Sequence, residues 1–350
     1  MFLKDCWYVA AWSKDVSDGL LPVKIIGQPV VLYRLASGEA IALEDRCVHR
    51  LAPLSCGKRE GDDLRCMYHG LRFAPDGRCV EIPGQDIIPP IARVYRYPVT
   101  EKGGWVWIWP GDPQLADAGL VPDVIGPGNP DWKIITSQID YDAHADLVID
   151  NLLDFSHLTY VHANSFAADK QWAEKRPKVE RIERGLRVSR WLSTAPAMRP
   201  ALTLYGQPVD TYQTYDFIAP GILTMQIAFC EPGSQKRSDD GPPVDGILRV
   251  NGNSQAVTPI DDHKTRYFFG LGSRSADTSD EQVNMIGKVG LAAFTEDRQM
   301  IEGQQQIMNI SPGVRPMPTN ADIAITHFHS IIRELAKQEA ARMDGSGTTA

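Results

Sequence analysis

Four residues near the amino terminus constrain this 350-residue chain more than any other feature: Cys47, His49, Cys66 and His69. Their pattern is C-x-H, sixteen intervening residues, and then C-x-x-H. Two thiolates on one iron and two imidazoles on the other form the ligand set of a Rieske [2Fe-2S] cluster. Because neutral imidazole donates less negative charge than thiolate, such a cluster accepts an electron at a higher potential than an all-cysteine cluster. The pattern therefore predicts a centre that transfers single electrons.

A zinc site with two cysteines and two histidines is the main alternative for the same four residues. Zinc modules more often use C-x-x-C and H-x-H spacings in smaller domains, which disfavours zinc here. A coincidence among the six cysteines and eight histidines is less favoured still. Iron with acid-labile sulfide and a brown colour distinguishes the cluster from a colourless zinc protein.

Composition narrows the class of protein further. The formal net charge of −8 disfavours nucleic-acid and anionic membrane partners, both of which attract positive charge. No apolar run reaches the length of a membrane span, and the amino terminus lacks the pattern of a signal peptide. Six cysteines are too few for a disulfide framework in a chain this long, so we expect reduced thiols and a cytoplasmic location. The cysteines outside the motif are expected to be small buried side chains: Cys6, Cys56, Cys79 and Cys230.

The length favours two domains, residues 1–112 and 113–350. The first is expected to be all-β, with strands over 23–34, 40–45, 70–74, 79–82 and 105–109 and the cluster ligands in loops. The Gly- and Pro-rich residues 113–130 are expected to connect the domains. In the second, helical periodicity over 143–161 precedes strand-like alternation over 177–270, helices over 279–308 and 322–343, and a frayed tail over 344–350. The predicted fold class is α+β, with an antiparallel sheet and helices in the second domain.

A second group of potential metal ligands follows the first predicted helix of the second domain. Asp154 and His157 are three residues apart and would share a face of a helix, whereas the step of five to His162 requires the helix to end or loosen. Two imidazoles with one carboxylate are the usual ligands of mononuclear non-haem Fe(II), and they leave positions open for O2. Four of the eight histidines fall in the two motifs, which favours metal ligation.

The remaining carboxylate is expected on the later helix, where Glu296, Asp297 and Glu302 are the candidates. Most helical carboxylates face solvent or form ion pairs. Periodicity does not choose between Glu296 and Asp297.

Together, in this order and separation, the two patterns resemble the oxygenase component of Rieske non-haem iron oxygenases. The resemblance extends over nearly the whole chain and is closest to members that demethylate or oxidise small aromatic acids, such as vanillate O-demethylase, dicamba O-demethylase and toluenesulfonate methyl-monooxygenase. The stretches that carry it are residues 6–12, 47–54, 66–71, 82–85, 107–113, 150–162, 267–270 and 296–297.

The resemblance implies a role for each motif residue. Cys47, His49, Cys66 and His69 would hold the [2Fe-2S] Rieske cluster. His157, His162 and Asp297 would hold the mononuclear Fe(II). Asp154 would link His69 of a neighbouring subunit to His157 in a head-to-tail homotrimer, and Asn151 would have a supporting role near the iron.

The implied function is that of a terminal oxygenase with an all-β Rieske domain and a helix-grip-like catalytic domain. Electrons from NAD(P)H would arrive through a separate reductase or ferredoxin component, and O2 would be the co-substrate. The expected reaction oxidises a methyl or methoxy group of a small aromatic acid, with O-demethylation releasing formaldehyde as the leading case. Ring hydroxylation, dihydroxylation or N-demethylation on the same scaffold are the alternatives. A Rieske electron-transfer protein is the alternative of a different class, and it would leave two-thirds of the chain unexplained.

The pocket is expected to be lined by residues 223–229 and 251–255. An acidic substrate would favour a cation there, and Arg190, Arg249 and Arg266 are the candidates, although each is more readily explained as a surface charge.

Overall fold

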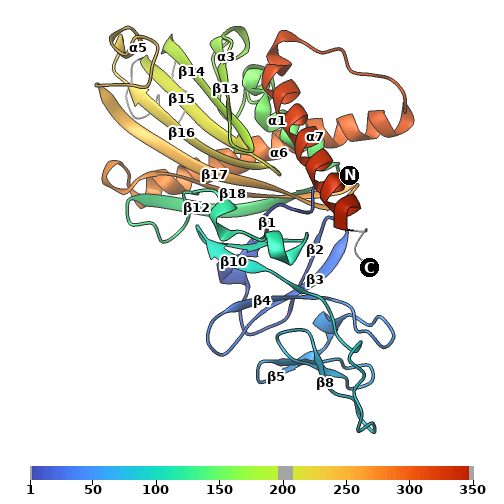
Figure 1. The fold of residues 1–350 in the computed structure, drawn as a ribbon. Helices are drawn as coiled ribbons and strands as arrows, with labels where there is room; N and C mark the ends of the chain where they lie inside the picture. Colours follow the sequence, from blue (N-terminus) through green and yellow to red (C-terminus); the bar gives the residue numbers. More distant parts are fainter. Residues whose placement is uncertain (1, 196–207, 347–350) are drawn as a thin grey trace. The chain divides into compact units, whose positions relative to one another are not determined.

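The computed structural model describes residues 2–195 and 208–346, and the chain divides into two compact units (Figure 1). The first unit comprises Met1–Val121 and Thr258–Asp262, and the second comprises Pro122–Val257 and His263–Ala350. Within the described ranges, no helix combines the length and apolar character needed to cross a bilayer.

The first unit is built from three antiparallel sheets, which confirms the all-β prediction. The sheets are β1 (Tyr8–Trp12), β11 (Trp105–Ile108) and β10 (Val99–Lys102); β2 (Leu21–Ile25), β3 (Gln28–Arg34), β4 (Ala40–Glu44) and β9 (Arg96–Tyr97); and β5 (Lys58–Glu60), β6 (Asp63–Arg65), β7 (Arg72–Phe73) and β8 (Cys79–Glu81). The single strand expected over 23–34 is wrong, because the chain reverses at Ile26 and Gly27, whose φ values are 44° and 84°. These two residues form the turn that pairs β2 with β3.

The core of the first unit includes two of the predicted cluster ligands. Cys47 and Cys66 are each 1% exposed and belong to one apolar cluster of side chains. That cluster draws on β3, β4, β6 and β7: Val31, Tyr33, Ile41, Leu43, Leu64 and Phe73. Packing of the two sheets therefore fixes the base of each cysteine loop.

The second unit contains a seven-stranded antiparallel sheet in the order β12-β18-β17-β16-β15-β14-β13. Its strands are β12 (Trp132–Tyr141), β13 (Lys178–Ile182), β14 (Gly185–Ala195), β15 (Val209–Ile218), β16 (Ile222–Cys230), β17 (Ile247–Asp261) and β18 (Lys264–Arg274). The helical segments of its described residues are α1 (Ala145–Leu153), η5 (Phe155–His157), α2 (Leu158–Val161), α3 (Gln171–Glu174), α5 (Ser234–Arg237), η6 (Ser275–Asp277), α6 (Asp280–Ile310), η7 (Asn320–Asp322) and α7 (Ile323–Ser346). This mixture of antiparallel sheet and helices confirms the predicted fold class.

Helix α6 begins and packs as its sequence predicts. Ser279 and Gln282 form a capping box, which satisfies N–H groups that the first turn leaves free. The helix lies against β12 and β18 (Figure 1). At Gly290 a Cβ atom would come within 2.2 Å of the Leu271 side chain, so this glycine allows the close approach of helix and sheet. Helix α7 continues to Ser346, so the frayed tail is wrong for 344–346, and residues 347–350 lie outside the described part.

The helix expected over 143–161 is interrupted, which corrects one sequence prediction. Helix α1 ends at Leu153, because Asp154 has extended backbone angles (φ −118°, ψ 102°). Its carboxylate accepts hydrogen bonds from the N–H (2.8 Å) and the hydroxyl (2.9 Å) of Ser156, and so begins the short segment η5. Asp154 and His157 therefore do not share one continuous helical face.

Candidate metal centres and the adjoining pocket

Two short loops of the first unit present the predicted cluster ligands, and the loops are built alike. The N–H of Cys47 donates to the carbonyl five residues later, and the Cys47 carbonyl accepts from the N–H four residues later. Cys66 repeats both hydrogen bonds. Each loop then turns through a residue in the left-handed region, Leu51 (φ 60°) in the first and Gly70 (φ 78°) in the second. The two loops therefore hold Cys47 and Cys66 in matching backbone conformations.

The ligand atoms divide between the interior and the surface. Cys47 and Cys66 are buried, whereas His49 and His69 are exposed, with ring centroids 4.4 Å apart. Burial raises the pKa of the Cys47 thiol to about 11. Two buried sulfurs and two neighbouring imidazoles, supplied by paired loops, fit the two-Cys, two-His ligand set of a Rieske cluster. The imidazoles would form its solvent-facing edge.

Gly70 offers a direct test of the second loop. A Cβ atom there would lie 2.8 Å from the Pro83 ring, and alanine would also adopt an unfavourable positive φ. We expect Gly70→Ala to lower the free energy of unfolding by about 1–3 kcal/mol and to reduce cluster occupancy. Thermal unfolding and visible absorbance per chain measure the two effects. Gly61→Ala is the control, since Gly61 has φ +65° but nothing within 4 Å, and it should keep its cluster.

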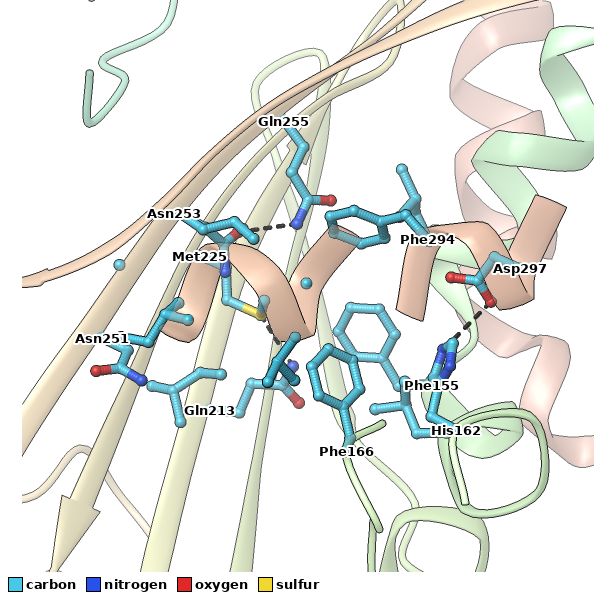
Figure 2. Close-up of a pocket in the computed structure, with 18 of the residues that line it drawn as sticks. Phe155, His162, Phe166, Gln213, Met225, Asn251, Asn253, Gln255, Phe294 and Asp297 are labelled. Carbon is cyan, nitrogen blue, oxygen red and sulfur yellow. Dashed lines mark hydrogen bonds and ion pairs between the residues drawn. The ribbon is translucent and has the colours of Figure 1, made fainter. Parts of the chain in front are cut away.

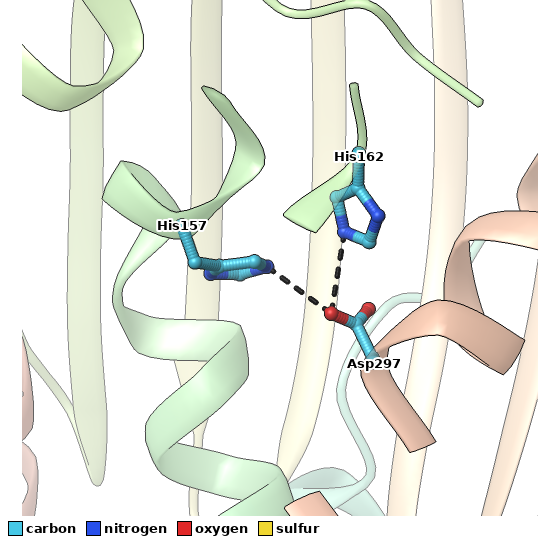
Figure 3. A group of neighbouring side chains, drawn as sticks. All are labelled: His157, His162 and Asp297. Atoms are coloured by element: carbon cyan, nitrogen blue, oxygen red, sulfur yellow. Dashed lines mark ion pairs between the residues drawn. The ribbon is translucent and has the colours of Figure 1, made fainter. Parts of the chain in front are cut away.

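The second candidate centre brings together three side chains from separate segments. His157 ends η5, His162 follows α2, and Asp297 lies on α6 (Figure 3). Asp297 Oδ1 lies 3.4 Å from His157 Nε2 and 3.2 Å from His162 Nε2. One donor atom of each residue lies within 4.8 Å of the others. Two imidazole nitrogens and one carboxylate converge here, which fits the donor set of a mononuclear non-haem iron.

The outer nitrogens of both imidazoles have partners that aim the inner nitrogens at this centre. His157 Nδ1–H donates to the backbone carbonyl of Asp154 (2.5 Å), and His162 Nδ1–H donates to Glu296 Oε2 (2.9 Å). Ser165 Oγ donates to the same Glu296 oxygen (2.6 Å). With Nδ1 protonated, Nε2 of each ring carries the lone pair that a metal requires.

These contacts separate the roles of the carboxylates that the sequence left open. Asp297 is 3% exposed and faces both Nε2 atoms, whereas Glu296 contacts His162 from behind. Glu302 accepts a hydrogen bond from the N–H of Asp142, away from the three side chains. Asn151 Nδ2 lies 3.2 Å from Asp297 Oδ1 and 3.5 Å from His157 Nε2, beside the centre.

The charges in the centre reinforce one another. Burial alone would raise the pKa of Asp297, yet the two imidazoles that face it lower that pKa to about 2. Burial alone would lower the pKa of His162, but hydrogen bonds and charge from Asp297 and Glu296 outweigh burial and raise it. The site therefore presents an ionised carboxylate beside two well-oriented imidazoles.

From the sequence, Glu296 is a candidate metal ligand. Its hydrogen bond to Nδ1 of His162 was not predicted. We expect Glu296→Gln to weaken iron binding at the mononuclear site by about 10- to 100-fold, because the amide holds His162 less firmly. Titration of the iron-depleted protein with ferrous ion under argon measures the affinity. Ser165→Ala, which removes only the second contact to Glu296, should have a smaller effect. Equal iron affinity in wild type and Glu296→Gln would contradict this role.

A pocket adjoins the three side chains in the second unit (Figure 2). Its volume is about 140 Å³, close to that of an engineered apolar cavity in another protein that binds benzene. The predicted segments 223–229 and 251–255 both contribute to its lining. They supply Met225, Ile227, Phe229, Asn251, Asn253 and Gln255, while α6 adds apolar side chains such as Val289 and Phe294.

None of the three arginines proposed from the sequence lines this pocket. Arg266 pairs with Asp140 (2.7 Å), and Arg190 stacks on Trp172. Arg249 donates a hydrogen bond to the lining residue Asn251 but does not line the pocket itself. Their interpretation as surface charges is wrong for Arg190 and Arg249, which are 7% and 3% exposed.

The structure also tests the expected burial of the remaining cysteines. Cys6, Cys79 and Cys230 are buried as expected, but Cys56 is exposed.

Comparison with known proteins gives the same two-part organisation. Residues 6–94 match the Rieske [2Fe-2S] domain, and residues 141–338 match the vanillate O-demethylase oxygenase C-terminal domain. The toluene-4-sulfonate monooxygenase system iron-sulfur subunit of Comamonas testosteroni is 36% identical over 97% of this chain and 98% of its own. The dicamba O-demethylase oxygenase component of Stenotrophomonas maltophilia is 30% identical over 97% and 99%. A crystal structure of dicamba monooxygenase bound to dicamba matches with a TM-score of 0.87 and 28% identity, covering 97% of this chain and 99% of that one.

A Rieske [2Fe-2S] domain followed by this sheet-and-helix domain defines the oxygenase component of a Rieske monooxygenase system. The chain belongs to this family, in the group whose second domain is that of the vanillate O-demethylase oxygenase. The alternative of a Rieske electron-transfer protein is wrong, because the match extends through the second domain.

Proposed function

We propose that this chain is the terminal oxygenase of a system that oxidises a methyl or methoxy group on a single-ring aromatic acid. O-demethylation, with release of formaldehyde, is the leading reaction. The observation that carries the proposal is the convergence of His157, His162 and Asp297 at one end of a pocket sized for one ring. Relatives named for toluene-4-sulfonate and dicamba support an aromatic acid as the substrate.

The residues that would hold the two groups follow from their donor atoms. Cys47, His49, Cys66 and His69 are assigned to the [2Fe-2S] cluster, and His157, His162 and Asp297 to the mononuclear iron. When bound, the two groups supply one-electron transfer and the activation of O2. Three protein donors leave coordination positions free, and Asn151 contacts two of those donors, so its amide is assigned a supporting role.

The stoichiometry of methyl oxidation defines what the pocket must bind and exclude. One O2, two electrons and two protons convert an aryl methyl group to hydroxymethyl, with one oxygen atom leaving as water. From an aryl methyl ether, the same step gives a hemiacetal that breaks down to a phenol and formaldehyde. The apolar lining supplied by Phe155, Leu158 and Phe294 would hold the ring beside the iron ligands and exclude water.

We also assign Asp154 to electron transfer between subunits of a head-to-tail homotrimer. Its backbone carbonyl, not its carboxylate, accepts from His157 within the chain, and its half-buried carboxylate accepts from Ser156. The exposed imidazole of His69 would meet that carboxylate from the neighbouring subunit. A ring of identical interfaces would repeat the junction in each subunit. A separate reductase or ferredoxin component would supply electrons from NAD(P)H, and a cytoplasmic location stays a prediction.

A substrate panel tests the proposed reaction. Purified protein with a surrogate reductase and NADH would be given methoxybenzoates, methylbenzoates, methylbenzenesulfonates and N-methylated anilides, and products would be identified by mass spectrometry. We expect formaldehyde with a phenol from methoxy acids, or hydroxymethyl products from methyl acids. Cis-dihydrodiols would contradict methyl oxidation and favour ring dihydroxylation. Products from the anilides alone would favour N-dealkylation, the reaction type in the name of a 33% identical chloroacetanilide N-alkylformylase.

A further inference from the structure

We propose that the pocket binds an oxyanion of the substrate, a carboxylate or sulfonate on the ring, through the carboxamide N–H groups of Asn251 and Asn253. Arg249 is the positioning residue for Asn251 and does not contact the substrate. The inference rests on the proposed function, which supplies the aromatic acid. The acid group would be recognised by the neutral N–H donors of Asn251 and Asn253, with the buried Arg249 in contact with Asn251.

The sheet places the polar groups in register on one face. Across β15, β16 and β17, Gln213 pairs with Ile227 and Ile227 with Asn251. The same pairing joins Met225 to Asn253 one row further along the strands. Because alternate residues of a strand share a face, Asn251, Asn253 and Gln255 all project to the side that lines the pocket. Figure 2 shows Asn251 at the end away from His162 and Asp297.

The orientation of the Asn251 carboxamide is fixed by Arg249. Arg249 Nε–H donates to Asn251 Oδ1 (3.0 Å) and also to the hydroxyl of Ser273 (3.0 Å). A guanidinium has only donors, so the atom of Asn251 that faces it must be the oxygen. The NH2 group of Asn251 is then left to donate on the other side.

Asn253 is oriented by a second, separate chain of hydrogen bonds. The buried hydroxyl of Tyr267 donates to Gln255 Oε1 (2.6 Å), and Gln255 Nε2 donates to Asn253 Oδ1 (3.1 Å). Both groups of the Gln255 amide are thus engaged within the protein. The oxygen of Asn253 is also engaged, which leaves its NH2 group as the second donor toward the pocket.

Gln213 leaves one polar atom unsatisfied at this end of the pocket. The side chain is 2% exposed, and its Oε1 atom has no hydrogen-bond partner among the residues that the structure describes. A buried polar atom of this kind is normally satisfied by water or a ligand. Gln213 lies in the same cross-strand row as Asn251. Because Oε1 only accepts, its partner must be a donor such as water, and the oxyanion is assigned to the N–H groups of Asn251 and Asn253.

The charges favour an anion over a neutral acceptor. Among residues 2–195 and 208–346, the ionisable side chains that line the pocket are His157, His162 and Asp297, all at the opposite end. Arg249 is 3% exposed, and its guanidinium directly contacts the carboxamide that would hold the ligand. At low local dielectric, a positive charge one side chain away favours a negative group at the two donors. A carboxylate or sulfonate also has several oxygens, so it can accept from both amides.

Calorimetric titration of the oxidised holoenzyme, without reductant and hence without turnover, tests the inference. The ligands are 4-methylbenzoate, 4-methylbenzenesulfonate and the matched neutral 4-methylbenzamide. We expect wild type to bind the two acids at least about 10-fold more tightly than the amide. Asn251→Asp, which replaces donors with acceptors at nearly constant shape, should weaken acid binding about 10- to 100-fold and affect amide binding little. Gln226→Leu, an exposed site on the opposite face of β16, is the control and should bind like wild type.

The role of Arg249 is read from the preference for acid over amide, because a general loss of structure would weaken both ligands alike. Arg249→Met should reduce that preference at least about 10-fold, and Arg249→Lys, which keeps the charge, should retain part of it. Unchanged acid binding in Asn251→Asp, or an unchanged preference in Arg249→Met, would overturn the inference. Equal binding of acids and amide to wild type would overturn it while leaving the proposed function intact. Binding of none of the three ligands would count against both.

Discussion

Asp297→Ala is expected to remove the mononuclear iron and abolish oxygenation while leaving the [2Fe-2S] cluster in place. The substitution takes away the only carboxylate that faces both Nε2 atoms among the residues that the structure describes, and two imidazoles alone bind ferrous ion weakly. Iron should fall from three atoms to two per chain, and turnover should fall by about three orders of magnitude or more. Iron analysis, visible absorbance and product formation measure the three quantities.

The visible spectrum of the [2Fe-2S] cluster is the control for folding in Asp297→Ala. Because the cluster loops belong to the other unit, their visible spectrum should match that of wild type. Glu296→Ala, one residue away on α6, should keep measurable turnover when ferrous ion is in excess, because it removes a contact to His162 and no metal donor. Full iron content and full activity in Asp297→Ala would show that the ligand assignment is wrong.

Asp154→Asn should separate metal content from turnover. Asparagine keeps the backbone carbonyl that accepts from His157, so both metal centres should remain loaded. The neutral side chain would lack the negative charge that we assign to the junction with His69 of a neighbouring subunit. We therefore expect turnover coupled to reductase to fall by about 10- to 100-fold or more, with the cluster still reduced by the reductase. Stopped-flow measurement of cluster reoxidation by O2, with substrate present, identifies the impaired step.

A matched substitution distinguishes this role from a local structural effect. Asp150→Asn makes the same change four residues earlier, where the carboxylate pairs with His329 (2.7 Å). Its turnover should stay within a few-fold of wild type. If Asp154→Asn retained both metals and normal coupled turnover, Asp154 would have no part in electron transfer.

The two loops with the candidate cluster ligands could be predicted from the sequence because each Cys/His pair is local. Cys47 and His49, and likewise Cys66 and His69, lie within one tight loop, so spacing along the chain nearly determines spacing in space. The matched hydrogen bonds of the loops were not predictable in the same way. Leu51 adopts the positive φ that Gly70 adopts in the other loop, and leucine gives no sequence signal for that conformation.

The helix break at Asp154 was missed for a physical reason. Phe155 and Leu158 are buried like the apolar residues of α1, so the hydrophobic periodicity continues across the break. The interruption comes from the Asp154 side chain, which competes for the N–H of Ser156. The Asp-x-Ser pattern was the available signal, and periodicity outweighed it.

The sequence alone does not determine which carboxylate belongs to the second centre. Glu296 and Asp297 are adjacent on α6, about 100° apart around the helix, and both meet His162. Which of them faces the inner nitrogen depends on how α6 packs against segments more than a hundred residues earlier. The same limit applies to the Asn251 carboxamide, because its direction depends on Arg249 and not on local sequence.

The presence of two distinct iron centres is tested by measuring iron and acid-labile sulfide per chain on protein purified and supplied with ferrous ion under argon. We expect three irons and two sulfides, with the third iron lost in His157→Ala and the other two retained. Two irons with two sulfides in wild type, or zinc in place of iron, would contradict this expectation.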